Sequence, residues 1–375
     1  MVEIERRFDP RDIAHVKVSV GLGDVKAVAE SGDQIVVLAR IHSGDESDLE
    51  IVQAGGELHV RQRELNFRRP QPLDVTLFLP ADRCPALSAN VGRGDLSLER
   101  LSAGARANTG KGNIVVSAAR GELQAQTGKG DIRVVQHQGA VHAVAGKGDI
   151  AVAGGSGALR IQTGFGDVSL ADWQVPDEAE CRVELGAGEC RVQRLVGGRL
   201  VVQGGRSSCT LEEVALPALR VQTAKGDVRL SGDPGAGEWQ VATATGDIAL
   251  TLAAAASARV EAATRRGSIA SDLPQVRVAR PGPASRVGGG RSISITDDHP
   301  KAHVHLETVL GDIRIRQQGS ARTQAPPPQA ADRPPEAAGR RASQRTALEV
   351  LESLARREIT VEEAEALLRT LEGAG

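Results

Sequence analysis

The sequence predicts an all-β protein, a parallel two-sheeted β-solenoid with about 18–22 residues per coil, followed by a small C-terminal α-helical hairpin. A Gly-Asp or Gly-Asn marker recurs every 18 residues, and a fixed period of this length is the signature of a repeat architecture. Each repeat holds two stretches in which apolar and other residues alternate, as in strands with one buried face. Helical spacing of apolar residues is confined to the C-terminal segment.

Residues 1–86 are expected to form irregular β-coils or a cap at the start of the solenoid. Val16, Val18 and Val20 alternate with other residues, which is typical of a half-buried strand. An early copy of the marker ends at Asp24. A terminal unit that departs from the repeat is expected, because an open sheet end is a template for aggregation.

Residues 87–316 are expected to form the regular solenoid. Ile114, Ile132 and Ile150 follow successive markers and should stack as an aliphatic ladder when each coil pairs in parallel with the next. The Gly-x-Gly before each marker should supply turns with positive φ. The markers expected to line one corner are Asp95, Asn113, Asp131, Asp149, Asp167, Asp227, Asp247 and Asp312. Looser copies of the marker occur at Glu189, Ser208, Ser268 and Ser292.

The remaining residues predict a linker and a helical hairpin. Residues 317–343 are rich in Pro and Ala and predict a disordered linker. Residues 344–373 predict two helices, in which Thr346 with Glu349 matches a capping box. A hairpin this short has too little core to be robust alone, so we expect it to bind a protein partner or a second copy. The residues expected to make that contact are Val350, Leu351, Leu354, Leu367, Leu368 and Leu371.

Composition limits the classes of ligand. The net charge is −2, so the bulk charge points neither to nucleic acid nor to a membrane surface. Two Trp, four Phe and no Tyr among 375 residues argue against recognition of sugars or bases, which usually relies on stacking faces. We therefore expect no nucleic-acid partner, no cofactor and no small-molecule substrate.

The N-terminus MVEIERRFDPRD lacks the apolar region of a secretory signal, and no stretch of about 18 apolar residues predicts a membrane span. We expect a cytoplasmic protein. The cysteines have no metal-ligand spacing and are expected to be reduced and buried. They are Cys84, Cys181, Cys190 and Cys209. His303 and His305 alternate with apolar residues and should face outward.

The repeated Gly-Lys-Gly-Asp cluster has several chemical interpretations besides a structural turn. A phosphate loop must open a helix, whereas a strand pattern follows each copy here. A calcium-binding β-roll needs Gly and Asp in both halves of its repeat, and the second half here lacks Asp. A polysaccharide lyase or hydrolase needs paired carboxylates in a cleft.

The structural interpretation is favoured over these. We expect each marker carboxylate to cap its own turn by accepting backbone N–H bonds. Lys111, Lys129 and Lys147 form a neighbouring row that should offset the repulsion among the carboxylates.

The run LPADRCPALSANVGRGDLSL, followed by TGKGDI-type coils, resembles the bacterial "putative adhesin" family, also called Toastrack, over about residues 10–317. The C-terminal run ALEVLESLARREITVEEAEALLRTL resembles a short helical hairpin of bacterial cell-envelope-stress regulators, in which it is commonly N-terminal. The resemblance implies a β-solenoid without catalytic residues, in an envelope-stress or regulatory setting.

Together these features favour a non-enzymatic β-solenoid scaffold that contacts other proteins through its hairpin. A surface adhesin is one alternative, and it requires an export route. A calcium-binding β-roll is the other.

Overall fold

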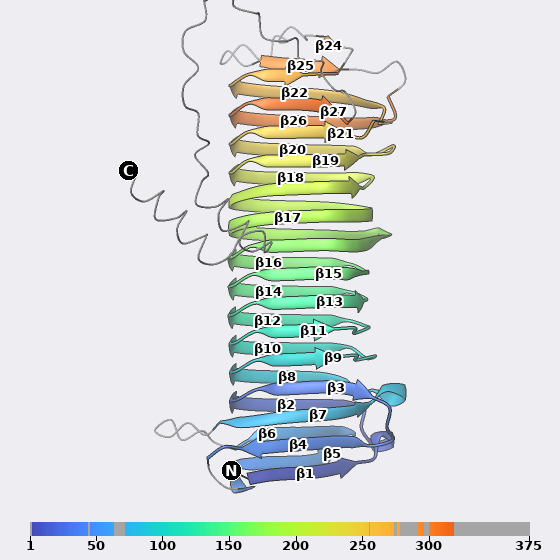
Figure 1. Ribbon diagram of the computed structural model, residues 1–375, viewed down its shortest axis with the longest axis vertical. Coiled ribbons are helices and arrows are strands. Elements are labelled where there is room, and N and C mark those ends of the chain that lie inside the picture. The colour runs from blue at the N-terminus through green and yellow to red at the C-terminus, as the bar shows by residue number, and fades with distance from the viewer. Residues whose placement is uncertain are drawn as a thin grey trace, which may run out of the picture. The chain divides into compact units, whose positions relative to one another are not determined.

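The computed structural model describes residues 2–43, 46–63, 72–254, 256–273, 276–277, 291–295 and 300–318. All of them belong to one compact unit, Met1–Ala321. Figure 1 shows this unit as a rod of stacked β-coils. The predicted all-β solenoid is confirmed for the described residues, whose regular elements are strands and three short 3-10 turns.

Successive coils pair in parallel along two ladders. Ladder A contains the strands that run up to the marker, and ladder B contains the strands that follow it. The regular strands of ladder A are β8 (Ala86–Arg93), β10 (Ala105–Lys111), β12 (Leu123–Lys129), β14 (Val141–Lys147), β16 (Leu159–Phe165), β18 (Ala218–Lys225) and β20 (Glu238–Thr245). Those of ladder B are β9 (Leu96–Glu99), β11 (Ile114–Ser117), β13 (Ile132–Gln138), β15 (Ile150–Ser156), β19 (Val228–Asp233) and β21 (Ile248–Leu252).

The long strand β17 (Val168–Ala215) winds through the coils between β16 and β18. Its parts pair with β15, β16, β18 and β19, so it contributes to both ladders. Coil length changes here, because Leu123 pairs with Val141, 18 positions on, whereas Leu159 pairs with Cys181, 22 positions on. The four extra residues lie between the paired segments, and the core pairs continue on either side of them. The register of β17 against β19 shifts once, between Leu211 and Val214.

Stacked aliphatic side chains fill the space between the ladders. Ile114 pairs directly with Ile132, and Ile132 with Ile150, and each is at most 1% exposed. Burial of one such side chain stabilises the fold by roughly 1.5–3 kcal/mol. The rod therefore gains a similar increment from every coil that is added to the stack.

At the N-terminal end the coils do not stack in chain order. β2 (His15–Leu22) lies between β6 (Glu57–Gln62) and β8, and β3 (Val25–Glu30) lies between β7 (Leu73–Pro80) and β9. β4 (Ile35–Ile41) is antiparallel to both β7 and β1 (Val2–Phe8), and β5 (Leu49–Ala54) is antiparallel to β6. The 3-10 turns are Pro10–Asp12, Glu46–Asp48 and Ala81–Arg83. The first segment thus supplies one coil of the regular stack as well as its cap.

The C-terminal end repeats this arrangement. β26 (Ala302–Leu310) lies between β20 and β22 (Ala258–Arg266), and β27 (Ile313–Gln317) lies between β21 and β23 (Ile269–Ser271). β25 (Arg291–Ile295) is antiparallel to β22 and to β24 (Val276–Arg277). Ser292 pairs with Ala263 in that antiparallel contact, so its interpretation as a looser marker is wrong.

The predicted linker lies outside the described residues from residue 319 onward, and so does the whole predicted hairpin, residues 344–373. Among the described residues no helix is long and apolar enough to cross a membrane.

The cysteine thiols lie largely in the core. Cys181, Cys190 and Cys209 are buried, Cys84 is half-buried, and all four are free. Burial raises the pKa of the Cys181 thiol, which keeps it protonated and unreactive. The prediction of buried thiols is confirmed for three cysteines and is wrong for Cys84, which is the most accessible of the four.

We expect one thiol of the native protein to react with a water-soluble thiol reagent, and four after unfolding, because only Cys84 has exposed surface. Counting modified cysteines by intact-protein mass spectrometry checks this. The Cys84→Ser variant should show none before unfolding, and fast labelling of Cys190 or Cys209 in that variant would contradict the described core.

Candidate functional site: corner ladder and grooved face

A chain of hydrogen bonds passes from coil to coil along one corner of the rod. The amide of Asp131 donates to Asn113 Oδ1, and the amide of Asp149 donates to Asp131 Oδ1, each at 2.9 Å. Bonds of this kind form two separate runs along the rod. The first run joins Asp74, Asp24, Asp95, Asn113, Asp131, Asp149, Asp167 and Glu189. The second run joins Asp227, Asp247, Asp312 and Ser268. The expectation that each carboxylate caps its own turn is wrong in one respect, since the donor belongs to the adjacent coil.

The bond exists because the parallel ladder leaves one donor without a backbone acceptor at every corner. Gly112 N–H donates to the Lys129 carbonyl and Ile114 N–H to the Asp131 carbonyl, both at normal distances of 2.8–2.9 Å. The Asn113 N–H between them donates instead to Asp95 Oδ1 (2.7 Å). A buried threonine completes the corner, since Thr127 Oγ1 donates to the Gly112 carbonyl (3.0 Å). Every polar backbone group of this turn is therefore satisfied.

Only the second glycine of each Gly-x-Gly adopts positive φ, as in Gly130 (φ 144°). The first glycine, such as Gly128, does not adopt it and faces outward at the end of its strand. A Cβ at Gly128 would lie 2.6 Å from the carbonyl oxygen of Gly110 on the adjacent coil. The prediction of positive φ thus holds for one glycine of the pair, while close approach of neighbouring coils requires the other.

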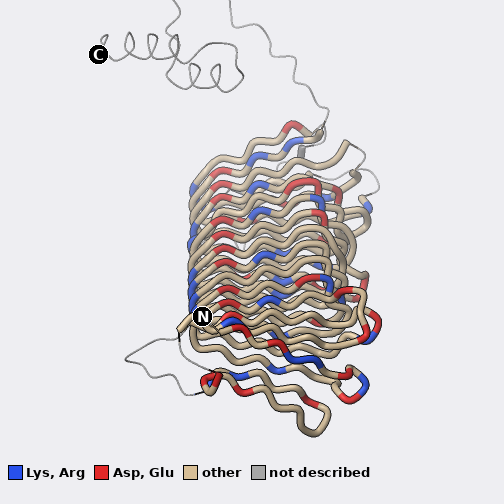
Figure 2. Tube along the Cα trace, turned by 60° about the horizontal axis from the view of Figure 1, so that its bottom comes forward, with Lys and Arg blue, Asp and Glu red and all other residues tan. Residues whose placement is uncertain are grey.

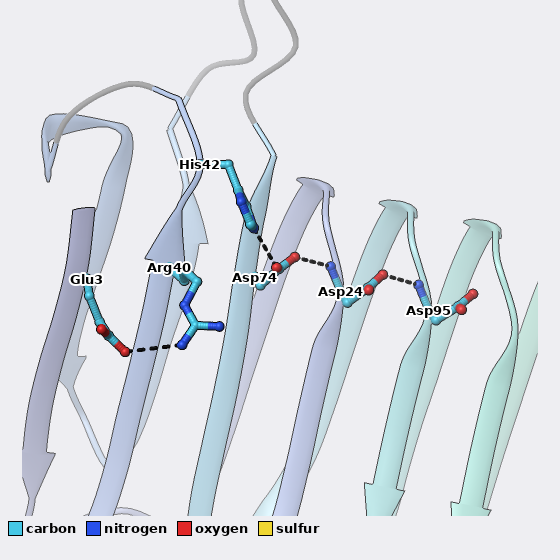
Figure 3. Close-up of polar contacts among 6 residues, drawn as sticks. All are labelled: Glu3, Asp24, Arg40, His42, Asp74 and Asp95. Atoms are coloured by element: carbon cyan, nitrogen blue, oxygen red, sulfur yellow. Dashed lines mark hydrogen bonds and ion pairs between the residues drawn. The ribbon is translucent and has the colours of Figure 1, made fainter. Parts of the chain in front are cut away.

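We call this chain of hydrogen bonds between marker residues the corner ladder, and Figure 3 shows how it begins at the N-terminal end of the rod. Asp74 Oδ1 accepts from the Asp24 amide (3.0 Å), and His42 Nε2 contacts Asp74 Oδ2 at 2.6 Å. Partial burial raises the pKa of Asp74, but the Asp24 amide and the His42 imidazole outweigh this and hold that pKa below its ordinary value. On the flanking strands Arg40 contacts Glu3 (3.4 Å).

A basic column runs beside the acidic column along this corner (Figure 2). Lys111 pairs in register with Lys129, and Lys129 with Lys147. Among the described residues, no carboxylate lies within ion-pair distance of these three lysines, although other cations of the rod have such partners. The two columns are thus neighbours, as predicted, but the lysines remain open to solvent.

Ladder A presents an outward surface that we call the grooved face. Amide side chains form one row along it, and glycine or alanine residues form the next row. The amide row contains Asn90, Asn108, Gln126, Gln162, Gln203 and Gln222. The small-residue row contains Gly92, Gly110, Gly128, Gly146, Gly164, Gly186, Gly205, Ala224 and Ala244.

The two rows enclose a groove. It consists of two hollows of about 830 Å³ each, which meet at Val144. One hollow reaches Ser19 on β2 and the other reaches Val309 on β26. At about 4.8 Å per strand, the groove extends over a distance on the order of 50 Å. The small residues form its floor and the amide row forms one wall. The lysines of the basic column do not line either hollow, but each directly follows a floor glycine in the chain, as Lys129 follows Gly128.

Sequence reasoning placed the functional residues elsewhere and missed this groove. The signal that could have found it is the alternation inside each ladder A strand, where Asn108 and Gly110 share the outward side, as do Gln126 and Gly128. Stacking these positions at the repeat period brings the amides into one row and the glycines into another. The side chains predicted to contact a partner, Val350, Leu351, Leu354, Leu367, Leu368 and Leu371, lie outside the described residues.

The other predicted polar positions lie on the surface. His303 and His305 face outward on β26, as predicted. In the described part of the chain, no group of three or more His, Cys, Asp or Glu side chains is arranged to hold a metal ion.

A family model described as Toastrack DUF4097 matches residues 13–316. No curated protein matches the chain.

Solved structures that match the chain come from several bacteria. A "putative cell adhesion protein" from Clostridium sporogenes is 11% identical, with 84% of this chain and 99% of that chain covered and a TM-score of 0.22. A "putative adhesin" from Parabacteroides distasonis is 9% identical, with 84% and 97% covered and a TM-score of 0.28. One from Bacteroides fragilis is 9% identical, with the same coverage and a TM-score of 0.23.

We expect Asp131→Ala to destabilise the rod by about 1–2 kcal/mol, because it leaves the Asp149 amide without its acceptor. Asp131→Asn should cost much less, since Asn113 already fills the same role in this chain. Urea unfolding of both variants, together with hydrogen exchange at the Asp149 amide, measures the difference. Equal destabilisation by Ala and Asn would show that the side-chain acceptor does not hold the corner.

We expect acid to weaken the N-terminal end of the ladder through Asp74. Its pKa is lowered in the folded state, so its contribution is present above the ordinary value of 3.8 and is lost as pH falls through the lowered pKa. The Tm of wild type should therefore fall more between pH 5 and pH 3 than the Tm of Asp74→Asn, which keeps an acceptor but does not titrate. Parallel pH profiles of the two proteins would contradict this.

Proposed function

The chain belongs to the Toastrack DUF4097 family, and from this premise we propose that it is a non-enzymatic scaffold, a rigid rod that binds an extended partner along its grooved face. The support is physical. The corner bonds tie each coil to the next, and the paired core positions allow little sliding of one coil over another. Such a rod holds its surface rows at a constant spacing.

The groove is the single observation that carries this proposal. A site for a small molecule is a compact pocket that buries most of its ligand. Here the hollows follow the rod from β2 to β26 and are lined by outward-facing residues of many strands. That shape suits a linear partner that makes a similar contact on each coil.

The C-terminal segment has a place in this proposal as a tether. The apolar positions of residues 344–373 would join the rod to a protein partner or to a second copy, in the regulatory setting that the sequence resemblance implies. A surface adhesin would use the same grooved face and differs in requiring export. The cytoplasmic location and the interaction of the hairpin stay predictions.

Substitution in the groove tests the proposal with the full chain. Val144, where the two hollows meet, is replaced by Trp, and Val115, an outward-facing residue of β11 on the opposite ladder, is replaced by Trp as the matched control. Binding to a panel of linear polysaccharides, extended peptides and single-stranded nucleic acids is measured by biolayer interferometry.

We expect at least one linear polymer to bind, with Val144→Trp weakening it tenfold or more because the indole fills the groove. Val115→Trp should change binding less than twofold. Absence of binding to every polymer, or an equal loss in both variants, would overturn the proposed function.

A further inference from the structure

In the N-terminal half of the grooved face the strands of ladder A carry only positive charge, and the acidic marker column lies two residues beyond the basic column, as Asp131 does beyond Lys129. The five strands β8, β10, β12, β14 and β16 contain six Lys or Arg residues and no Asp or Glu. The six are Arg93, Arg106, Lys111, Lys129, Lys147 and Arg160. The net charge of −2 for the whole chain conceals this local excess.

Among the described residues none of these six cations has a carboxylate within ion-pair distance, although Arg160 is close enough to Glu184 to help Arg182 lower the pKa of that carboxyl. Elsewhere on the rod arginines sit in ion pairs, as Arg182 does with Glu184 (2.6 Å) and Arg61 with Glu50 (2.6 Å). Lysines that pair in register repel each other, because like charges directly opposite on neighbouring strands are destabilising. A bound polyanion would turn this repulsion into attraction.

The groove walls restrict the kind of polyanion. The amide row offers both donors and acceptors, and Asn108 Nδ2 already donates to Asn90 Oδ1 at 2.8 Å. Hydroxyl groups need both kinds of partner, whereas phosphate oxygens need only donors. Because glycines form the floor in this half, a ligand can lie against the backbone beside the amide row. Each lysine directly follows a floor glycine in the chain, as Lys129 follows Gly128.

One exposed aromatic side chain stands in the basic column. Phe165 is 62% exposed and pairs in register with Lys147, whose Nζ lies 5.9 Å from the ring centre. A single ring can pack against one sugar, but a run of bases requires a stacking face at successive positions. Glu184 follows on the next coil of the amide row, so the favourable region for an anion ends there.

We propose that this half of the groove binds an acidic polysaccharide, a linear glycan that carries carboxylate or sulfate groups at regular intervals. Lys111, Lys129 and Lys147 contact its anionic groups, one coil apart, and the amide row binds its hydroxyls. This inference rests on the proposed function, since it names the partner class of the same groove. It differs from the expectation, drawn from the scarcity of aromatic residues, that the chain recognises no sugars, and the experiment below decides between the two.

The test compares two triple variants of the full chain. Lys111→Gln, Lys129→Gln and Lys147→Gln together remove the basic column, while Arg133→Gln, Arg229→Gln and Arg314→Gln remove the same charge from ladder B. The probes are polygalacturonate, heparin, dextran as a neutral glycan, and single-stranded oligo-dT. Affinities are measured at low and physiological salt, and thermal unfolding checks that both variants fold.

We expect polygalacturonate or heparin to bind, and the lysine variant to lose at least tenfold in affinity. The arginine variant should lose less than twofold, and salt should weaken the wild-type complex. Tighter binding of polygalacturonate would indicate a carboxylated glycan, and tighter binding of heparin would indicate a sulfated one.

Tighter binding of oligo-dT or dextran, or unchanged affinity in the lysine variant, would overturn the acidic-glycan inference. The groove proposal would still stand in that case if Val144→Trp abolished binding. If Val144→Trp left the affinity for every bound polymer unchanged, the groove proposal itself would be overturned.

Discussion

A backbone N–H at each marker corner needs an acceptor, and in the two runs of corner bonds a side-chain oxygen of the adjacent coil supplies it. This hydrogen bond explains why the sequence repeats, because it needs an Asp or Asn at the same position of each coil. Asn113 serves as well as the aspartates, so the requirement is for an acceptor oxygen at a fixed height and not for a charge. Glu189 and Ser208 occupy the position where the two runs of bonds are separated, with side chains of a different length.

The same strict register decides what the surface can do. Coils that stack without sliding place equal positions above one another, so each outward position becomes a row along the rod. A row of glycines becomes the floor of a groove, a row of amides becomes a wall, and a row of lysines becomes a band of positive charge. In these rows an outward-facing side chain of one coil therefore recurs at the same position on the coils above and below it.

The ends of the rod obey a different constraint. An open ladder exposes unpaired backbone groups and invites further strands. At the N-terminal end the inner strands β2 and β3 precede the outer strands β6 and β7 in the chain. At the C-terminal end the outer strands β22 and β23 precede the inner strands β26 and β27. Antiparallel strands then close each end, and β1 adds charged side chains at one of them.

The sequence by itself determined the solenoid, its coil length and the residues of its marker corner, because a local period directly encodes strand, turn and stacking partner. It also determined that Cys181, Cys190 and Cys209 fall among core residues. It did not determine the order of the coils at the ends, since an equivalent alternation in β2, β22 and β26 fits several neighbours and only long-range packing selects one. The groove and its basic half were likewise decided by tertiary structure, because six cations scattered over residues 93–160 meet on one face only when the coils stack.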